Sequence, residues 1–83
     1  MKILNPKRGD LIRFCAMNDF IGENEILKGK VIGKGREIRK MYPVEMALAP
    51  ENYSLVERDI HGTKTYYVVT PEEVKVILES EEQ

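Results

Sequence analysis

The chain is poor in the residues from which catalytic and metal sites are usually built. Its 83 residues include one cysteine, one histidine and no tryptophan. A single cysteine excludes an internal disulfide and a cysteine-based metal cluster. No apolar run approaches the ~18 residues of a membrane-spanning helix, and residues 1–6 lack the apolar core of a signal peptide. These absences predict a cytoplasmic protein that contacts no membrane.

Neither reactive side chain lies in a pattern typical of an active site. Cys15 stands between Phe14 and Ala16 in an apolar run, where a free cysteine is usually a small core residue. His61 precedes Gly62 in a predicted turn, which favours an exposed position. The sequence contains no P-loop or dinucleotide fingerprint, and its acidic residues lack calcium-loop spacing. We therefore expect no enzymatic activity, no metal and no cofactor.

Length and composition indicate one small globular domain. Apolar residues make up 42% of the chain and charged residues 33%, as in ordinary folded proteins. A chain of this length rarely contains a deep substrate cavity as well as a core. We expect residues 1–78 to form the domain and residues 79–83 to form an acidic, frayed tail.

Short apolar segments with alternating or β-branched residues predict an all-β fold of five to six strands. The segments are residues 10–17, 26–33, 44–49, 53–60 and 63–69, with a closing strand near 74–78. His61-Gly62 joins two of them, and a two-residue connection with glycine is typical of a β-hairpin. Residues 18–24 read as a loop in which Phe20 and Ile21 fold back over the core edge.

Two segments allow more than one interpretation. In residues 36–42, Ile38 and Met41 have helical spacing, but Pro43 disfavours helical backbone at the residue before it. Residues 70–78 begin with Thr-Pro-Glu-Glu, which is typical of a helix start. The alternative, which we favour because the segment is β-branched, is one helical turn followed by a short strand.

The predicted core consists of the apolar residues of these strands. Its members are Leu11, Ile12, Phe14, Val31, Ile32, Val44, Val56, Val68, Val69, Val74 and Val76. Residues 7–14 (KRGDLIRF) and 28–33 (KGKVIG) together resemble the opening of SH3-like small barrels, and residues 66–77 (YYVVTPEEVKVI) are similar to their final strands. Many small uncharacterised bacterial and phage proteins look alike in this way. The resemblance implies a single SH3-like barrel with one helical turn near the C-terminus, and it implies no single function.

Charge is distributed unevenly along the chain. Residues 1–40 carry ten basic and five acidic side chains, whereas residues 41–83 carry three basic and nine acidic ones. The basic residues are densest between 28 and 40. With the aromatic residue that follows, they form the candidate nucleic-acid site Lys28, Lys30, Lys34, Arg36, Arg39, Lys40 and Tyr42.

Two functions therefore remain open. The first is a non-catalytic binding or adaptor module that engages a protein partner or a second copy of itself, with the oppositely charged halves steering the contact. The alternative is a nucleic-acid-binding barrel in which the basic stretch 28–40 meets the phosphate backbone. A solvated strand edge rich in lysine would explain the same charges without any ligand.

Overall fold

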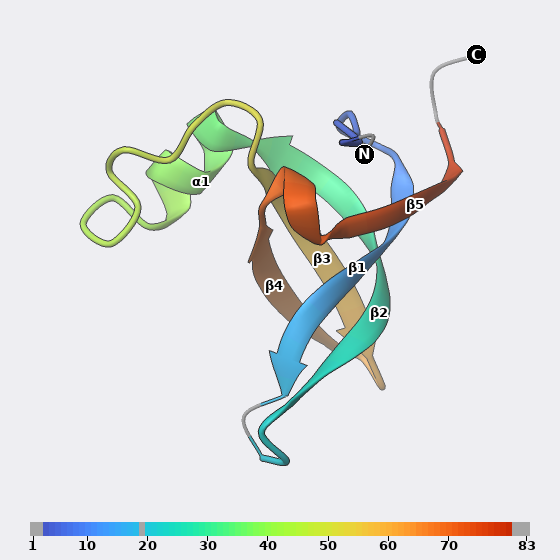
Figure 1. The fold of residues 1–83 in the computed structure, drawn as a ribbon. Helices are drawn as coiled ribbons and strands as arrows, with labels where there is room; N and C mark the ends of the chain where they lie inside the picture. The colour runs from blue at the N-terminus through green and yellow to red at the C-terminus, as the bar shows by residue number, and fades with distance from the viewer. Residues whose placement is uncertain (1–2, 19, 81–83) are drawn as a thin grey trace.

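The computed structural model describes residues 3–18 and 20–80, which fold into five strands, one α-helix and one 3-10 helix (Figure 1). The elements in chain order are β1 (Leu11–Asn18), β2 (Glu23–Lys34), α1 (Gly35–Met41), β3 (Ser54–Ile60), β4 (Thr63–Val69), η1 (Pro71–Glu73) and β5 (Val74–Glu79). The predicted all-β class is confirmed, because the strands form one antiparallel sheet in the order β4-β3-β2-β1-β5.

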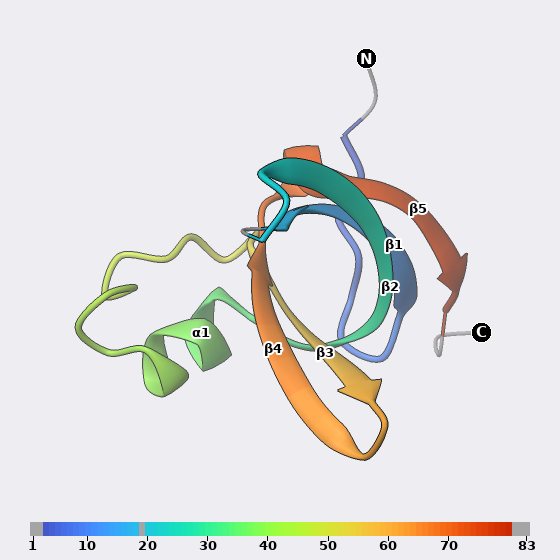
Figure 2. The same cartoon turned by 90° about the horizontal axis from the view of Figure 1, so that it is seen from below.

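The five-stranded sheet curls around one apolar interior (Figure 2), and we call this curled sheet the barrel. Its buried core consists of Ile12, Phe14, Val31, Val56, Val69 and Val74. Phe14 and Tyr67 meet edge to face, with ring centroids 5.3 Å apart. All six core residues belong to the core predicted from sequence.

The turn before β1 is tied to β2 through backbone hydrogen bonds. The Asp10 carboxylate accepts a hydrogen bond from the Lys7 amide at 2.9 Å. Gly9 donates to the Val31 carbonyl at 2.7 Å, and Val31 donates to the Asp10 carbonyl at 2.8 Å. Arg8 is therefore held beside the end of β2 that leads into α1.

The predicted hairpin is confirmed as β3 and β4. His61 has a φ of 52° and Gly62 a φ of 86°, which is the pair of left-handed residues that a type I′ turn requires. The Gly62 amide also donates to the Asp59 carboxylate at 2.9 Å.

Of the two interpretations of residues 70–78, the turn followed by a strand is confirmed. The Glu73 carboxylate caps η1 by accepting a hydrogen bond from the Thr70 amide at 2.9 Å. β5 then pairs with β1 and ends at Glu79, opposite Leu11. Glu79 was predicted to begin the tail, but it belongs to the sheet, and residues 81–83 lie outside the described part of the chain.

α1 and residues 42–53, together the α1 limb, pack on the outer face of the barrel (Figure 1). A second buried cluster forms there from Ile38, Ala49 and Leu55, against which Tyr42 and Met46 are partly buried. These limb residues recur every three or four positions, and the amides of Met46 and Ala49 bond backward to the carbonyls of Tyr42 and Met46. The limb therefore continues a helical pattern past Pro43 as a series of turns.

The prediction of a strand at residues 44–49 is wrong, because these residues form turns of the limb. The alternating Val44, Met46 and Leu48 do not share a buried face, because Val44 is 84% and Leu48 93% exposed. Val76 is also outside the core: it lies opposite Arg13 on the outer face of the sheet and is 39% exposed. Leu11, Ile32 and Val68 are only partly buried.

Candidate functional site

Lys34, a member of the predicted basic site, is bound within the protein. Its ammonium donates to Asn5 Oδ1 at 3.0 Å, to the Pro6 carbonyl at 2.8 Å and to Ser54 Oγ at 2.9 Å. Burial lowers the pKa of this amine, and the carboxylates of Asp10 and Glu51 act in the opposite direction. Lys34 therefore ties the N-terminal segment to β3, and its donors face the protein.

Arg39 and Tyr42 also serve the fold. The Arg39 guanidinium donates to the Ala49 carbonyl and forms an ion pair with Glu51, so it joins α1 to the rest of the limb. Tyr42 is half-buried against the second cluster around Ile38, where its ring stabilises the limb. Like Lys34, these two predicted site residues therefore make contacts within the protein.

Lys28 and Lys30 are exposed on the outer face of β2, as their spacing predicts. Their neighbours across the sheet differ in charge. Arg13 of β1 lies opposite Lys28, and Glu57 of β3 lies opposite Lys30. Glu57 also pairs with Lys64 at 3.7 Å, so this face carries charges of both signs.

Arg36 and Lys40 are exposed on α1, on either side of Glu37 in the sequence. The Glu37 carboxylate caps the helix by accepting a hydrogen bond from the Lys34 amide at 2.8 Å. That hydrogen bond is the main cause of the lowered pKa of Glu37, and the positive charges of Arg8 and Arg36 contribute in the same direction. Arg8, from the turn before β1, therefore lies close to the start of α1.

The Glu37 cap gives the stability of the protein a defined pH dependence. Its folded pKa lies below the ordinary value of 4.5, so its contribution is complete above that pH and is lost as pH falls through the folded pKa. We expect Glu37→Gln to lower the free energy of unfolding by about 0.5 kcal/mol near neutral pH, and the difference should vanish in acid.

Urea unfolding of both proteins across the acidic range measures this difference. Glu45→Gln, at an exposed limb position, is the control and should leave the curve unchanged. Glutamine also keeps an acceptor oxygen for the Lys34 amide, so a Glu37→Gln difference that persists below the folded pKa would show that the loss does not come from the charge of Glu37.

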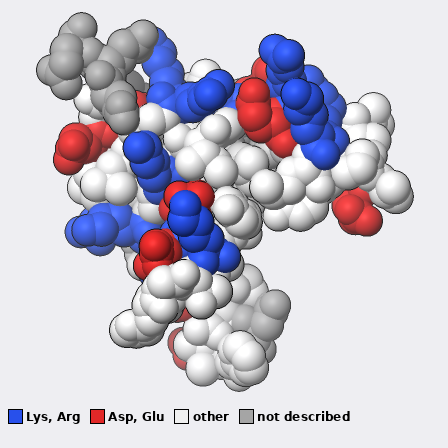
Figure 3. Space-filling view, turned by 180° about the vertical axis from the view of Figure 1, so that it is seen from behind, with Lys and Arg blue, Asp and Glu red and all other residues white. Residues whose placement is uncertain are grey.

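Two shallow hollows meet at Ile32 and form what we call the Ile32 groove. One, of about 380 Å³, is lined by Ile32, Glu37, Lys40, Met41 and Leu55. The other, of about 420 Å³, is lined by Arg8, Gly9, Lys30, Val31 and Ile32. Seen from behind, Lys and Arg side chains gather over α1 on one side and over the N-terminal turn and β2 on the other. Acidic side chains lie among both groups, and uncharged surface lies between them (Figure 3).

The floor of the groove is apolar because of how β2 and the limb are built. A bulge between Val31 and Gly33 interrupts the pairing of β2 with β3 at Ile32. The Ile32 side chain packs on the second cluster beside Leu55, and Met41, 44% exposed, extends the apolar surface along α1. Sequence reasoning missed Arg8, Ile32 and Leu55 as site residues, because only the fold brings them beside α1.

The groove presents the cations Arg8, Lys30 and Lys40, the carboxylate of Glu37, and a floor of methyl and thioether groups. Cys15 is half-buried in β1 and His61 is exposed in the β3–β4 turn, so neither lines the groove. Within residues 3–18 and 20–80, no group of three or more His, Cys, Asp or Glu side chains is placed to hold a metal ion.

Comparison of the chain with protein-family models, with curated proteins and with solved structures gives no match. The resemblance to SH3-like barrels therefore stays a prediction. The described helices are all too short or too polar to cross a membrane.

Proposed function

We propose that the protein is a non-catalytic binding module that takes up a protein segment in the Ile32 groove. An apolar side chain of the segment enters the hollow between Ile32, Met41 and Leu55. Acidic residues beside it meet Arg36 and Lys40 on the rim. The observation that carries this proposal is an apolar floor on an exposed surface whose lining holds three cations, Arg8, Lys30 and Lys40, against one carboxylate, Glu37.

The apolar part of the surface favours a protein ligand over a phosphate backbone. Burial of apolar area drives most protein association, whereas carboxylates on the rim select the partner and speed the encounter. Methionine suits such a site, because its flexible thioether adapts to different side chains. Val44 and Leu48 are further exposed apolar residues on the limb.

The nucleic-acid alternative has less support from the positions of its residues. Lys34, Arg39 and Tyr42 contact the protein itself, and Glu57 lies opposite Lys30 on the face that phosphates would approach. The alternative stays a prediction, which binding of a single-stranded oligonucleotide tests. A cytoplasmic location and an SH3-like barrel remain part of the proposal.

A peptide titration followed by amide NMR tests the proposal. The probe is an acetylated and amidated peptide that carries Phe-Leu between pairs of acidic residues, and the control peptide has lysine in place of each acid. We expect the acidic peptide to shift the amides of Ile32, Met41 and Leu55, with binding that weakens as salt rises. The lysine peptide should leave these amides unchanged.

Charge reversal on the rim sharpens this test. The double variant Arg36→Glu with Lys40→Glu is expected to weaken peptide binding about tenfold or more, because like charges then face each other. The matched control is Arg13→Glu with Lys75→Glu, which makes the same change in net charge on the outer face of β1 and β5. Binding of a single-stranded oligonucleotide, without binding of the acidic peptide, would instead establish the nucleic-acid alternative.

A further inference from the structure

A second exposed apolar surface lies at the end of the barrel far from α1. It is the β1–β2 tip, residues 17–25 with the exception of residue 19, which the structure does not describe. Phe20 is fully exposed, Ile21 is 61% exposed and Met17 is 58% exposed. The prediction that Phe20 and Ile21 fold back over the core is therefore wrong. An exposed cluster of this kind marks an interaction surface.

Asn18 makes hydrogen bonds to residues 20, 22 and 25 of the tip. Its side-chain oxygen accepts a hydrogen bond from the Phe20 amide at 3.0 Å, and its carbonyl accepts one from the Gly22 amide at 2.8 Å. Gly22 has a φ of 68°, which a glycine adopts without strain. The Asn18 amide group also donates to Glu25 at 2.9 Å. These hydrogen bonds support the described residues of the tip, on which Phe20 and Ile21 are exposed.

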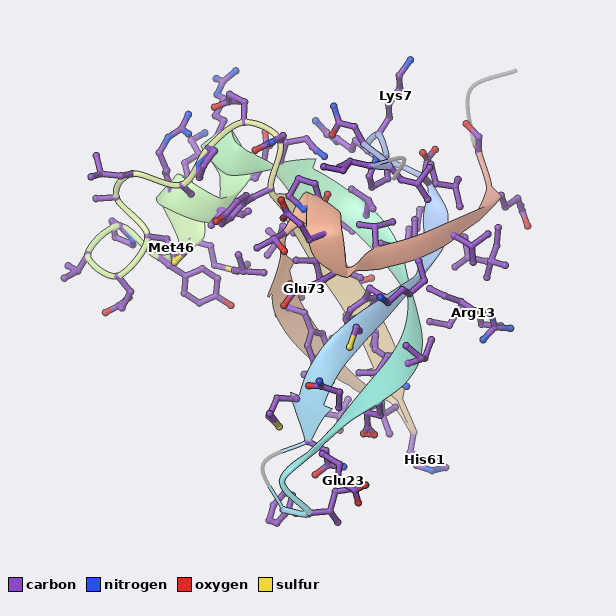
Figure 4. The ribbon with its side chains drawn as sticks, viewed as in Figure 1. Lys7, Arg13, Glu23, Met46, His61 and Glu73 are labelled. Atoms are coloured by element: carbon purple, nitrogen blue, oxygen red, sulfur yellow. The ribbon has the colours of Figure 1, made fainter. Side chains whose placement is uncertain are left out.

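The outer end of the tip is acidic, with Arg58 beside Phe20 and Glu25 at its base. In the lining of the groove, cations outnumber the one carboxylate, Glu37. Glu23 is exposed and Glu25 half-buried within two to four residues of Ile21, and Figure 4 shows Glu23 at the outer end of the hairpin. The groove carries Arg8, Lys30 and Lys40 around its apolar floor, and Arg36 lies near Glu37 on α1. The groove suits a segment in which acidic residues flank two adjacent apolar residues, and the tip is such a segment.

Resting on the proposed function, we infer that the ligand of the Ile32 groove is the β1–β2 tip of a second copy of this chain. The tip cannot reach the groove of its own chain, because the two lie at opposite ends of the barrel (Figures 1 and 4). Phe20 of one copy enters the hollow beside Met41 of the next, and Glu23 lies against the cations of α1.

This contact joins two different surfaces. A chain of molecules therefore has a free tip at one end and a free groove at the other, and each end can bind a further copy. Such a head-to-tail contact produces open chains whose length grows with protein concentration, unless the rotation closes a ring. The contact area is small, and small contacts of this kind are weak and reversible. Salt should shorten the chains by screening the charged rim.

Sedimentation velocity on two complementary variants tests the inference. The tip variant is Phe20→Ser, and the groove variant is Arg36→Glu with Lys40→Glu; all three positions are exposed, so both variants should fold. We expect the unmodified protein to sediment faster as its concentration rises from micromolar to millimolar. Each variant alone should remain monomeric.

The mixture of the two variants gives the decisive result. The groove variant keeps its tip and the tip variant keeps its groove, so a mixture should form one-to-one dimers that grow no further. The control pair Arg13→Glu with Lys75→Glu should associate as the unmodified protein does. A mixture that stays monomeric while the unmodified protein associates would overturn the inference, because the contact would then not join tip and groove.

Three other results would also overturn it, and the first two separate it from the proposed function. If the unmodified protein is monomeric at millimolar concentration yet its groove binds the acidic peptide, the binding module stands and its ligand is another protein. If association survives Phe20→Ser but not the groove variant, a different segment of the second copy occupies the groove. If neither the peptide nor a second copy binds, the groove itself is not a binding site.

Discussion

Replacing Ile38 by alanine is expected to release the α1 limb from the outer face of the sheet while the barrel stays folded. Ile38 is fully buried at the centre of the second cluster, where it contacts Ala49 and Leu55. Truncating a buried isoleucine to alanine costs about 2–5 kcal/mol. The limb has few other buried side chains to offset this loss, whereas the barrel core around Phe14 is untouched.

Amide hydrogen exchange followed by NMR distinguishes local release from global unfolding. In Ile38→Ala, protection should fall in residues 35–53 and persist in β1 and β2. Binding of the acidic peptide should be lost with the limb, because Met41 leaves the groove. Met41→Ala, at a partly exposed position of the same helix, is the control and should keep the protection pattern. An equal loss of protection in every strand would mean that limb and barrel unfold as one unit.

The strands could be predicted from sequence where local chemistry determines them. The hairpin turn at His61-Gly62 needs two left-handed residues, and β5 follows a cap and a proline that suit a single helical turn. Both are decided by residues adjacent in the chain. The limb could not be predicted in this way, because Pro43 signals a helix end while Ile38, Tyr42, Met46 and Ala49 continue to pack with helical spacing. Contact with Leu55 of β3, not local propensity, holds those turns.

The site could be predicted only in part, because the fold brings its residues together from distant positions in the chain. Charge along the sequence located Lys30 and Lys40, which line the groove. It also selected Lys34 and Arg39, whose partners are distant residues. Lys34 bonds residues 20 and 29 positions away, and Arg39 pairs with Glu51. A run of basic residues does not show which of them the fold uses internally. Nor does it show Arg8, which the β1 entry turn brings to α1.

The second large effect is the loss of stability expected when Lys34, whose ammonium donates hydrogen bonds within the protein, is replaced by methionine. Lys34→Met keeps a flexible side chain of similar length but removes every hydrogen-bond donor from it. Ser54 and Pro6 are buried, so their oxygens lose a partner that water replaces poorly. Asp10 is 3% exposed, and its Oδ1 atom has no hydrogen-bond partner within the described residues. Its carboxylate then also loses its nearby cation.

We expect Lys34→Met to lower the free energy of unfolding by about 2 kcal/mol, since each buried acceptor left without a donor costs about 1–3 kcal/mol. The loss stays below the sum of these terms because the substitution also removes the burial of a charge, which is what lowers the pKa of Lys34. Guanidinium unfolding measures the effect, and Lys28→Met, at an exposed position of β2, is the control. A loss no larger than that of the control would show that Lys34 is an ordinary surface cation, as the sequence alone suggests.

The pH dependence of the free energy of unfolding shows whether the effect of Lys34→Met comes from the lost ammonium group or from changed side-chain packing. Because the folded pKa of Lys34 lies below the ordinary value of 10.5, the folded state releases this proton first as pH rises. Between the two pKa values the unfolded chain binds more protons, so this group makes the protein more stable with rising pH in that window. Lys34→Met should lack this rise, whereas Lys28→Met should keep it. If the alkaline profiles of the two variants coincide, Lys34 does not titrate as a buried amine, and the polar contacts to Asn5, Pro6 and Ser54 are not what holds the N-terminal segment on the barrel.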